Sequence, residues 1–129
     1  MACAARAEFK QASLSVLATN ASQTFTDSVA INGWIDTITI DVVSAASSGT
    51  VGVVSSPYVA TIADVTLIDT AAHASDTVYR PRFDGTDTAG AALTGDDPWK
   101  YLSYGNVILS VTASSATGLV YRAVILYEQ

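Results

Sequence analysis

The stretch Asn106 to Glu128, NVILSVTASSATGLVYRAVILYE, has the pattern of two β-strands joined by a short polar connection. Apolar residues recur at alternate positions in both halves, and alternate side chains of a strand point to the same face. We expect one buried row in each strand, namely Val107, Leu109 and Val111, then Val120, Val124 and Leu126. The connection ends in Gly118, and glycine tolerates a left-handed backbone. The stretch therefore predicts a closing β-hairpin, which needs a second layer to be stable in water.

Further strands are indicated on the N-terminal side of this hairpin. Residues 8–19 and 34–43 alternate in hydropathy, and the turn dipeptide Asn32-Gly33 precedes the second of these segments. In that segment we expect one parity to face the core: Trp34, Ile38, Ile40 and Val42. A short strand over 50–54 ends near Pro57, because proline cannot donate to a ladder. Residues 58–69 fit a strand, with a short helix over 61–74 as the alternative.

The amino-acid composition favours an all-β chain. Val and Ile outnumber Leu, whereas Glu and Lys, which favour helices, occur only twice each. At 129 residues the chain has the length of one domain. We predict a single β-sandwich or jelly-roll-like barrel of about six to eight mostly antiparallel strands, closed by the C-terminal hairpin. The domain spans 1–129, with 1–10 as a flexible or partner-reaching arm.

The charge balance and the hydropathy restrict the classes of partner. The net charge is −6 and the basic residues are scattered, so nucleic-acid binding is not expected. No run approaches the roughly 20 apolar residues that span a bilayer, and no signal peptide is recognisable, so no membrane partner is expected. Cys3 is the single cysteine, which rules out an internal disulfide and favours assembly in a reducing cytoplasm.

No catalytic constellation is recognisable, and we expect a non-enzymatic protein without a cofactor. His73 is the single histidine; a loop position is the plainer interpretation, and a hydrolase that pairs it with a serine or with aspartates is the alternative. A glycine-rich segment carries oxygen ligands of the kind that Ca²⁺ takes, namely Asp84, Asp87, Asp96 and Asp97. Their spacing does not fit an EF-hand, and Asp and Gly also favour turns, so no metal site is assigned.

Aromatic and arginine side chains are the other candidates. Trp99, Tyr101 and Tyr104 could cap the core, anchor a subunit contact or form a sugar-binding platform. Arg80 and Arg82 flank a proline and indicate ion pairing between loops or between subunits. Tyr121 and Tyr127 lie opposite the expected buried row of the last strand. The interface candidates are Arg80, Arg82, Trp99, Tyr101, Tyr104, Tyr121 and Tyr127.

Two consecutive stretches carry a resemblance to a known class. Residues 76–95 read DTVYRPRFDGTDTAGAALTG, and residues 99–128 read WKYLSYGNVILSVTASSATGLVYRAVILYE. An extended Y-x-P-R segment, a D-T-x-G loop, an aromatic segment and a closing hairpin follow in this order. The order resembles small β-sandwich structural proteins of tailed bacteriophages, among them head decoration (cement) proteins and head-fibre bases.

The resemblance implies a virion protein that decorates or stabilises the capsid. Its partners would be the major capsid protein and further copies of itself, with a homotrimer as the favoured state. It would be assembled in the host cytoplasm and reside on the capsid surface. The class assigns no catalytic residues. The alternative is a carbohydrate-binding or adhesin-like module on a tail or fibre, using Trp99, Tyr101 and Tyr104.

Overall fold

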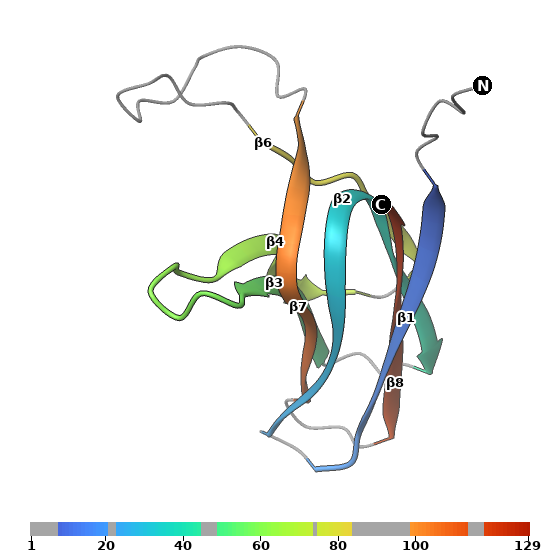
Figure 1. Cartoon of the computed structure of the whole chain (residues 1–129). Coiled ribbons are helices and arrows are strands. Elements are labelled where there is room, and N and C mark those ends of the chain that lie inside the picture. Colours follow the sequence, from blue (N-terminus) through green and yellow to red (C-terminus); the bar gives the residue numbers. More distant parts are fainter. Residues whose placement is uncertain (1–7, 21–22, 45–48, 74, 84–98, 114–117) are drawn as a thin grey trace, which may run out of the picture.

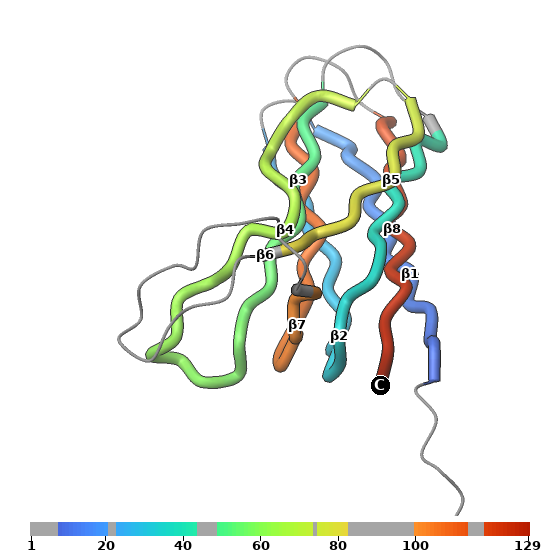
Figure 2. The backbone as a smooth tube through the Cα atoms, turned by 90° about the horizontal axis from the view of Figure 1, so that it is seen from above, coloured from blue at the N-terminus to red at the C-terminus, as the bar shows by residue number. Residues whose placement is uncertain are grey.

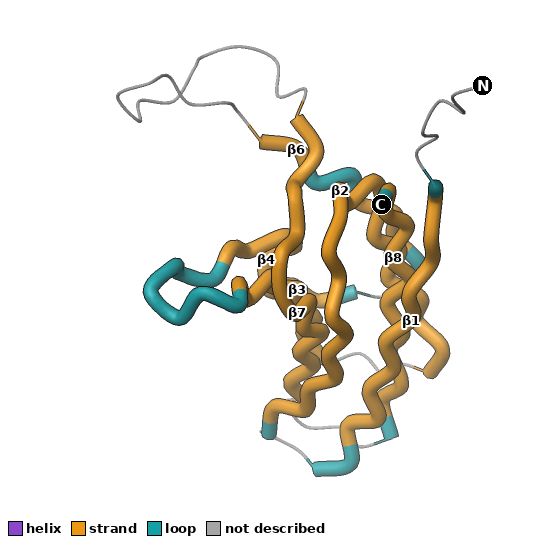
Figure 3. Tube along the Cα trace, in the orientation of Figure 1, coloured by secondary structure: helices purple, strands orange, loops and turns teal. Residues whose placement is uncertain are grey.

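The computed structural model describes residues 8–20, 23–44, 49–73, 75–83, 99–113 and 118–129, and the regular elements in these ranges are all β-strands (Figures 1 and 3). The strands are β1 Phe9–Ala18, β2 Thr24–Ser44, β3 Gly49–Pro57, β4 Val65–Ala72, β5 Thr77–Tyr79, β6 Arg82–Phe83, β7 Trp99–Ala113 and β8 Leu119–Glu128. The prediction of an all-β chain is confirmed, and the helix considered over 61–74 is wrong, since β4 occupies much of that segment.

Strand β2 is the centre of the sheet and changes partner along its length. It is 21 residues long. Its first part, Thr24 to Ile35, pairs with β7, and its second part, Trp34 to Ser44, pairs with β8. Strand β1 adds to β8, β3 adds to β7 and β4 adds to β3, which gives the antiparallel order β1-β8-β2-β7-β3-β4. Strand β5 pairs with the second part of β2, and β6 pairs with the start of β7.

The predicted C-terminal hairpin is wrong in its pairing, although both of its arms are strands. Strand β2 lies between β7 and β8, so the two arms are not neighbours in the sheet. Both edges of β7 pair elsewhere, with β2 and β3, and both edges of β8 pair with β1 and β2. Gly118 does have the expected left-handed backbone, with φ of 77°. Alternation in hydropathy identifies strands but carries no information about which strands are adjacent.

A β-bulge in β2 explains where the strand changes layer. The register with β8 shifts between Ile35 and Thr37. Up to Ile35 the odd-numbered residues face the core, and from Ile38 onward the even-numbered residues do. One extra residue, Asp36, inverts the parity, as a bulge does. The expectation that Trp34 faces the core is therefore wrong, whereas Ile38 and Ile40 are buried as expected.

The two parts of the sheet enclose one core, which Figure 2 shows from above with β3, β7, β2, β8 and β1 following one another. The buried row of β7 is Val107, Leu109 and Val111, as expected. In β8 the buried row is the other parity, namely Leu119, Tyr121, Ala123 and Ile125, so the expected row of Val120, Val124 and Leu126 is wrong. A Cβ on Gly49 of β3 would meet Leu119 and Tyr121, which shows that the two parts pack face to face.

The described ladder is an open one, since it ends at β1 on one side and at β4 on the other, and it does not close into a barrel. The turn expected at Asn32-Gly33 does not form. The two residues lie inside β2, where Gly33 allows a close approach of the β8 backbone. The strand expected from residue 58 begins at Val65. Residues 58–64 form a turn that extends away from the body of the sheet, as Figures 1 and 2 agree.

Candidate functional site

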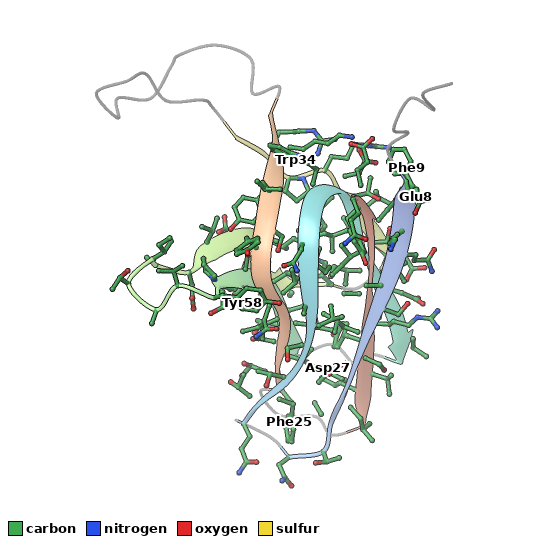
Figure 4. All side chains as sticks on the ribbon, viewed as in Figure 1. Glu8, Phe9, Phe25, Asp27, Trp34 and Tyr58 are labelled. Atoms are coloured by element: carbon green, nitrogen blue, oxygen red, sulfur yellow. The ribbon has the colours of Figure 1, made fainter. Side chains whose placement is uncertain are left out.

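An exposed group of large side chains lies on the outer surface of β2 and β7 and on the residue that follows β3. We call this group the aromatic patch. The exposed fractions of its members are 44% for Trp34, 50% for Tyr58, 49% for Leu102 and 63% for Tyr104. Figure 4 shows Trp34 near the upper bend of β2 and Tyr58 where the β3–β4 connection leaves the sheet. Contiguous exposed apolar surface of this kind marks a contact site on a soluble protein.

Backbone pairing fixes the aromatic patch in place. Trp34 is the register partner of Leu102, and Asn32 is the partner of Tyr104. The Tyr58 backbone N–H donates to the Tyr104 carbonyl oxygen at 3.1 Å, just beyond the last pair of the β3–β7 ladder. The rings of Tyr58 and Tyr104 meet edge to face, with centroids 5.6 Å apart and planes at 75°. The patch is thus a rigid surface rather than a set of independent side chains.

A shallow hollow of about 310 Å³ lies within the aromatic patch. Trp34, Leu102 and Tyr104 line it, and Asn32 and Glu128 contribute polar groups. Ser103 also lines it, and the Ser103 hydroxyl is buried without a hydrogen-bond partner among the described residues. The hollow is open and mainly apolar, a form that fits contact with another surface better than enclosure of a small molecule.

The surface around the patch carries no charged side chain along the paired parts of β2 and β7. The residues that alternate with the inward-facing ones are Thr24, Thr26, Ser28, Ala30, Asn32 and Trp34 on β2, and Leu102, Tyr104, Asn106, Ile108, Ser110 and Thr112 on β7. We call these twelve residues the outer face. A hydrogen bond of 2.8 Å between the hydroxyls of Thr24 and Thr112 joins the two rows. In a chain with net charge −6, an uncharged face of this extent is a distinct feature.

A cluster of charged side chains holds the bulge of β2. Arg82 donates to the Asp36 carbonyl oxygen at 3.0 Å and to the Asp36 carboxylate at 3.2 Å. Lys100 lies 3.1 Å from the same carboxylate and 3.2 Å from the carboxylate of Glu128. The Phe9 ring lies against the Lys100 ammonium, with its centroid 5.6 Å away. The cluster thus ties β2, β6, β7 and β8 together where β2 changes layer.

The position of Lys100 within this cluster changes its acid–base behaviour. Burial alone would lower the pKa of Lys100, but hydrogen bonds and charge attraction from Asp36 and Glu128 outweigh it, so the pKa is raised above 10.5. The ammonium therefore stays charged throughout the physiological range. All four charged groups satisfy one another, which makes the cluster a structural clamp rather than a site with a free acid or base.

His73 follows the last residue of β4, so its expected loop position is confirmed, but its side chain is buried rather than at the surface and has partners on both ring nitrogens. Nδ1 lies 3.0 Å from the Ala71 carbonyl oxygen, and Nε2 lies 2.6 Å from the Tyr79 hydroxyl. A carbonyl can only accept, so Nδ1 carries the proton and Nε2 accepts from the tyrosine in the neutral ring. Tyr121, whose hydroxyl lies 3.5 Å from the His73 carbonyl oxygen, has a pKa raised by burial. This arrangement fills the core, and among the described residues no serine or carboxylate hydrogen-bonds to the ring.

The structure separates the residues predicted for an interface or a sugar platform. Tyr101 turns inward, and its hydroxyl donates to Ser55 Oγ at 3.1 Å, whereas Tyr104 points outward. Trp99 pairs through its backbone with Phe83, and its side chain is outside the described part. Tyr101 and Tyr104 are three residues apart on one strand, so their side chains point to opposite faces and cannot form one platform.

The remaining candidates are also separated. Arg82 of β6 pairs with Asp36 of β2 within the chain, so its ion pair joins two strands rather than two loops or two subunits, while Arg80 is exposed. Tyr121 is buried in the core and is not available to a partner, and Tyr127 packs against that core. The candidate calcium ligands Asp84, Asp87, Asp96 and Asp97 lie outside the described residues.

Within the described ranges, no three side chains of His, Cys, Asp or Glu come close enough to hold a metal ion. The same ranges contain no helix that is long and apolar enough to span a membrane. Comparison with protein-family models, with curated proteins and with solved structures gives no match for this chain.

The exposure of three members of the aromatic patch is not predicted from the sequence. The hydropathy pattern places Trp34 in the core, because the bulge at Asp36 leaves no mark in that pattern. Leu102 lies in a run of alternating residues that fits either facing. Tyr58 follows Pro57, which ends β3, so its exposure could have been inferred from the proline.

Proposed function

We propose that this chain is a non-enzymatic structural protein of a tailed-phage virion, which decorates or stabilises the capsid lattice as a homo-oligomer. The observation that carries the proposal is the aromatic patch on a rigid, uncharged outer face. A surface of this kind favours protein assembly, because burying it removes apolar surface from water and leaves no unpaired charge buried in the contact.

The sequence resemblance of residues 76–128 to phage decoration and head-fibre proteins supplies the biological setting. A decoration protein needs a stable scaffold and repeated contacts, and many weak contacts on a lattice add up through avidity. The charged clamp around Asp36 and the fixed pair Tyr58–Tyr104 make the scaffold rigid at the surface in question.

The proposal is tested by binding to capsids of the parent phage that have been purified without this chain. We expect saturable co-sedimentation at a fixed ratio to the major capsid protein, and a raised resistance of the decorated capsid to heat. A chain that stays monomeric in light scattering and does not co-sediment would overturn the proposal.

A second candidate function is carbohydrate binding on a tail or fibre, through Trp34 and Tyr104 rather than through Trp99 and Tyr101. It is favoured by the hollow, where exposed aromatic rings lie beside the polar side chains of Asn32 and Glu128. Binding on a glycan array that disappears in Trp34→Ala and persists in Leu17→Ala, a change of an exposed residue on β1, would support it. An array without signal would remove it.

A further inference from the structure

We propose that a second copy of this chain covers the outer face, in a two-fold arrangement in which the 58–62 turn of each copy packs into the aromatic hollow of the other. The inference deepens the proposed homo-oligomeric role and rests on that proposal for its biological meaning only. Its physical basis is the charge, the shape and the extent of the surface.

The charge pattern selects a copy of the chain over an oppositely charged partner. Two chains of net charge −6 repel one another, so they associate most easily where no charged groups meet. The twelve residues of the outer face are all uncharged, and the acidic Glu128 that lines the hollow is paired with Lys100 at 3.2 Å. A basic partner surface would instead be matched by acidic residues, because electrostatic complementarity is how a charged partner is selected. The Thr, Ser and Asn side chains both donate and accept hydrogen bonds, so the face is complementary to itself.

The shape selects a two-fold arrangement. The turn after β3 projects from the sheet and exposes Val59 and Ile62, while the hollow at Trp34 and Leu102 is concave. The two features are adjacent, since the Tyr58 that begins the turn contacts the Tyr104 that lines the hollow. When the convex turn and the concave hollow lie side by side on one surface, a two-fold axis lets the turn of each copy fill the hollow of the other at the same time. Rings and filaments would need the two parts on different sides of the molecule.

The extent of the surface fits a reversible dimer. The two adjacent strands β2 and β7 make a face about 35 Å long and about 10 Å wide, or about 350 Å² per copy. Two such faces bury about 700 Å², to which the two 58–62 turns add, and contacts below about 1,200 Å² are weak and transient. We therefore expect a concentration-dependent dimer rather than an obligate one.

The first experiment measures the mass of the full chain by sedimentation velocity and light scattering from about 1 µM to about 500 µM. We expect a rise from one to two chain masses. Leu102→Lys should weaken the dimer at least about tenfold, because it places a lysine of each copy in the apolar contact. The matched control is Leu17→Lys on β1, which changes the same residue type at a similar exposure, 54% against 49%, outside the outer face. Circular dichroism verifies that both variants are folded.

The second experiment traps the predicted contact by disulfide formation. Two chains of different mass are prepared in a Cys3→Ser background, one with Ile62→Cys and the other with Asn32→Cys. We expect the mixture to form a disulfide-linked pair of unequal chains under mild oxidation, since the turn of one copy meets the hollow of the other. A control mixture with Leu17→Cys in place of Asn32→Cys should not form that pair.

The proposal is overturned if the chain stays monomeric over the whole concentration range, or if Leu102→Lys and Leu17→Lys weaken the dimer equally. It is also overturned by a trimer in which the Ile62→Cys and Asn32→Cys chains form no disulfide. Its failure is distinct from failure of the proposed virion role. A monomer that still decorates capsids contradicts only the dimer, and a dimer with the expected link and no capsid affinity contradicts only the virion role.

Discussion

Gly33 of β2 lies against the backbone of Glu128 in β8, so closely that a Cβ on Gly33 would come within 2.3 Å of the Glu128 carbonyl oxygen. This contact occurs where β2 passes from β7 to β8. The glycine is therefore required by the crossing of the strand from one part of the sheet to the other, and not by a turn.

Gly33→Ala should consequently be severely destabilising, by about 3 kcal/mol or more, because the obstacle is backbone and cannot rotate away. Gly118→Ala is the matched control. Gly118 has a left-handed φ of 77° but open space around it, so its cost should be about 1–2 kcal/mol. Urea denaturation compares the two free energies of unfolding, and equal values would contradict the close approach.

Much of the fold could be predicted from the sequence, and its connectivity could not. Alternating hydropathy predicts the strand over residues 8–19, which is β1, as well as the two arms that are β7 and β8. The predicted pairing of β7 with β8 is wrong because a strand such as β8, which is apolar at both odd and even positions, indicates neither which face is buried nor which strand is its neighbour. The bulge at Asp36 was invisible for a related reason, since it depends on Arg82 and Lys100, which are distant in the sequence.

The facing of β8 is tested by a pair of adjacent substitutions. Ile125→Asp places an uncompensated carboxylate in the core and should cost more than about 4 kcal/mol or prevent folding. Val124→Asp places the same group on the partly exposed side, beside Ser13 and Thr39, and should cost about 1–2 kcal/mol. Thermal melts of the two variants distinguish the facings. If Val124→Asp were the more damaging change, the assignment of the buried row would be inverted.

The clamp at the bulge should contribute more to stability than an exposed ion pair of the same chain. Asp36→Asn leaves Arg82 and Lys100 without their shared carboxylate, and we expect a loss of about 1–2 kcal/mol. Asp41→Asn removes the partner of the half-exposed Arg122, and the expected loss is about 0–1 kcal/mol. Chemical denaturation at low ionic strength measures both losses. A larger effect at Asp41 would show that the bulge does not depend on its charges.

Stability should fall at alkaline pH. The folded-state pKa values of Tyr121 and Lys100 are both raised, from ordinary values of 10.0 and 10.5. A raised pKa contributes stability that is fully present below the ordinary value and is lost as the pH rises through the folded-state value. Melting temperatures should therefore decline above about pH 10. Tyr121→Phe should decline less steeply than the parent chain, and an equal slope would contradict the effect of burial on this hydroxyl.

The orphan hydroxyl of Ser103 allows a prediction of the opposite sign. Ser103 Oγ is buried, and no described group hydrogen-bonds to it. Ser103→Ala removes a polar atom that gains nothing in the folded state, so the stability should stay level or rise by up to about 1 kcal/mol. Ser55→Ala is the comparison, because the Ser55 hydroxyl accepts from Tyr101 and its loss should be destabilising. A drop at Ser103 as large as that at Ser55 would indicate an unrecognised partner.

The placement of β2 between β7 and β8 also sets the order in which the sheet can form during synthesis. β3–β4 and β2–β5 are the described strand pairs that can assemble before residue 99 is made. Strand β1, the first strand of the chain, waits for β8, the last one, over ten register pairs. Until then β1 and most of β2 present unpaired edges, which are templates for aggregation. We expect nascent chains arrested before β8 to be sensitive to protease and to depend on chaperones, and folding to be completed only once β8 has left the ribosome.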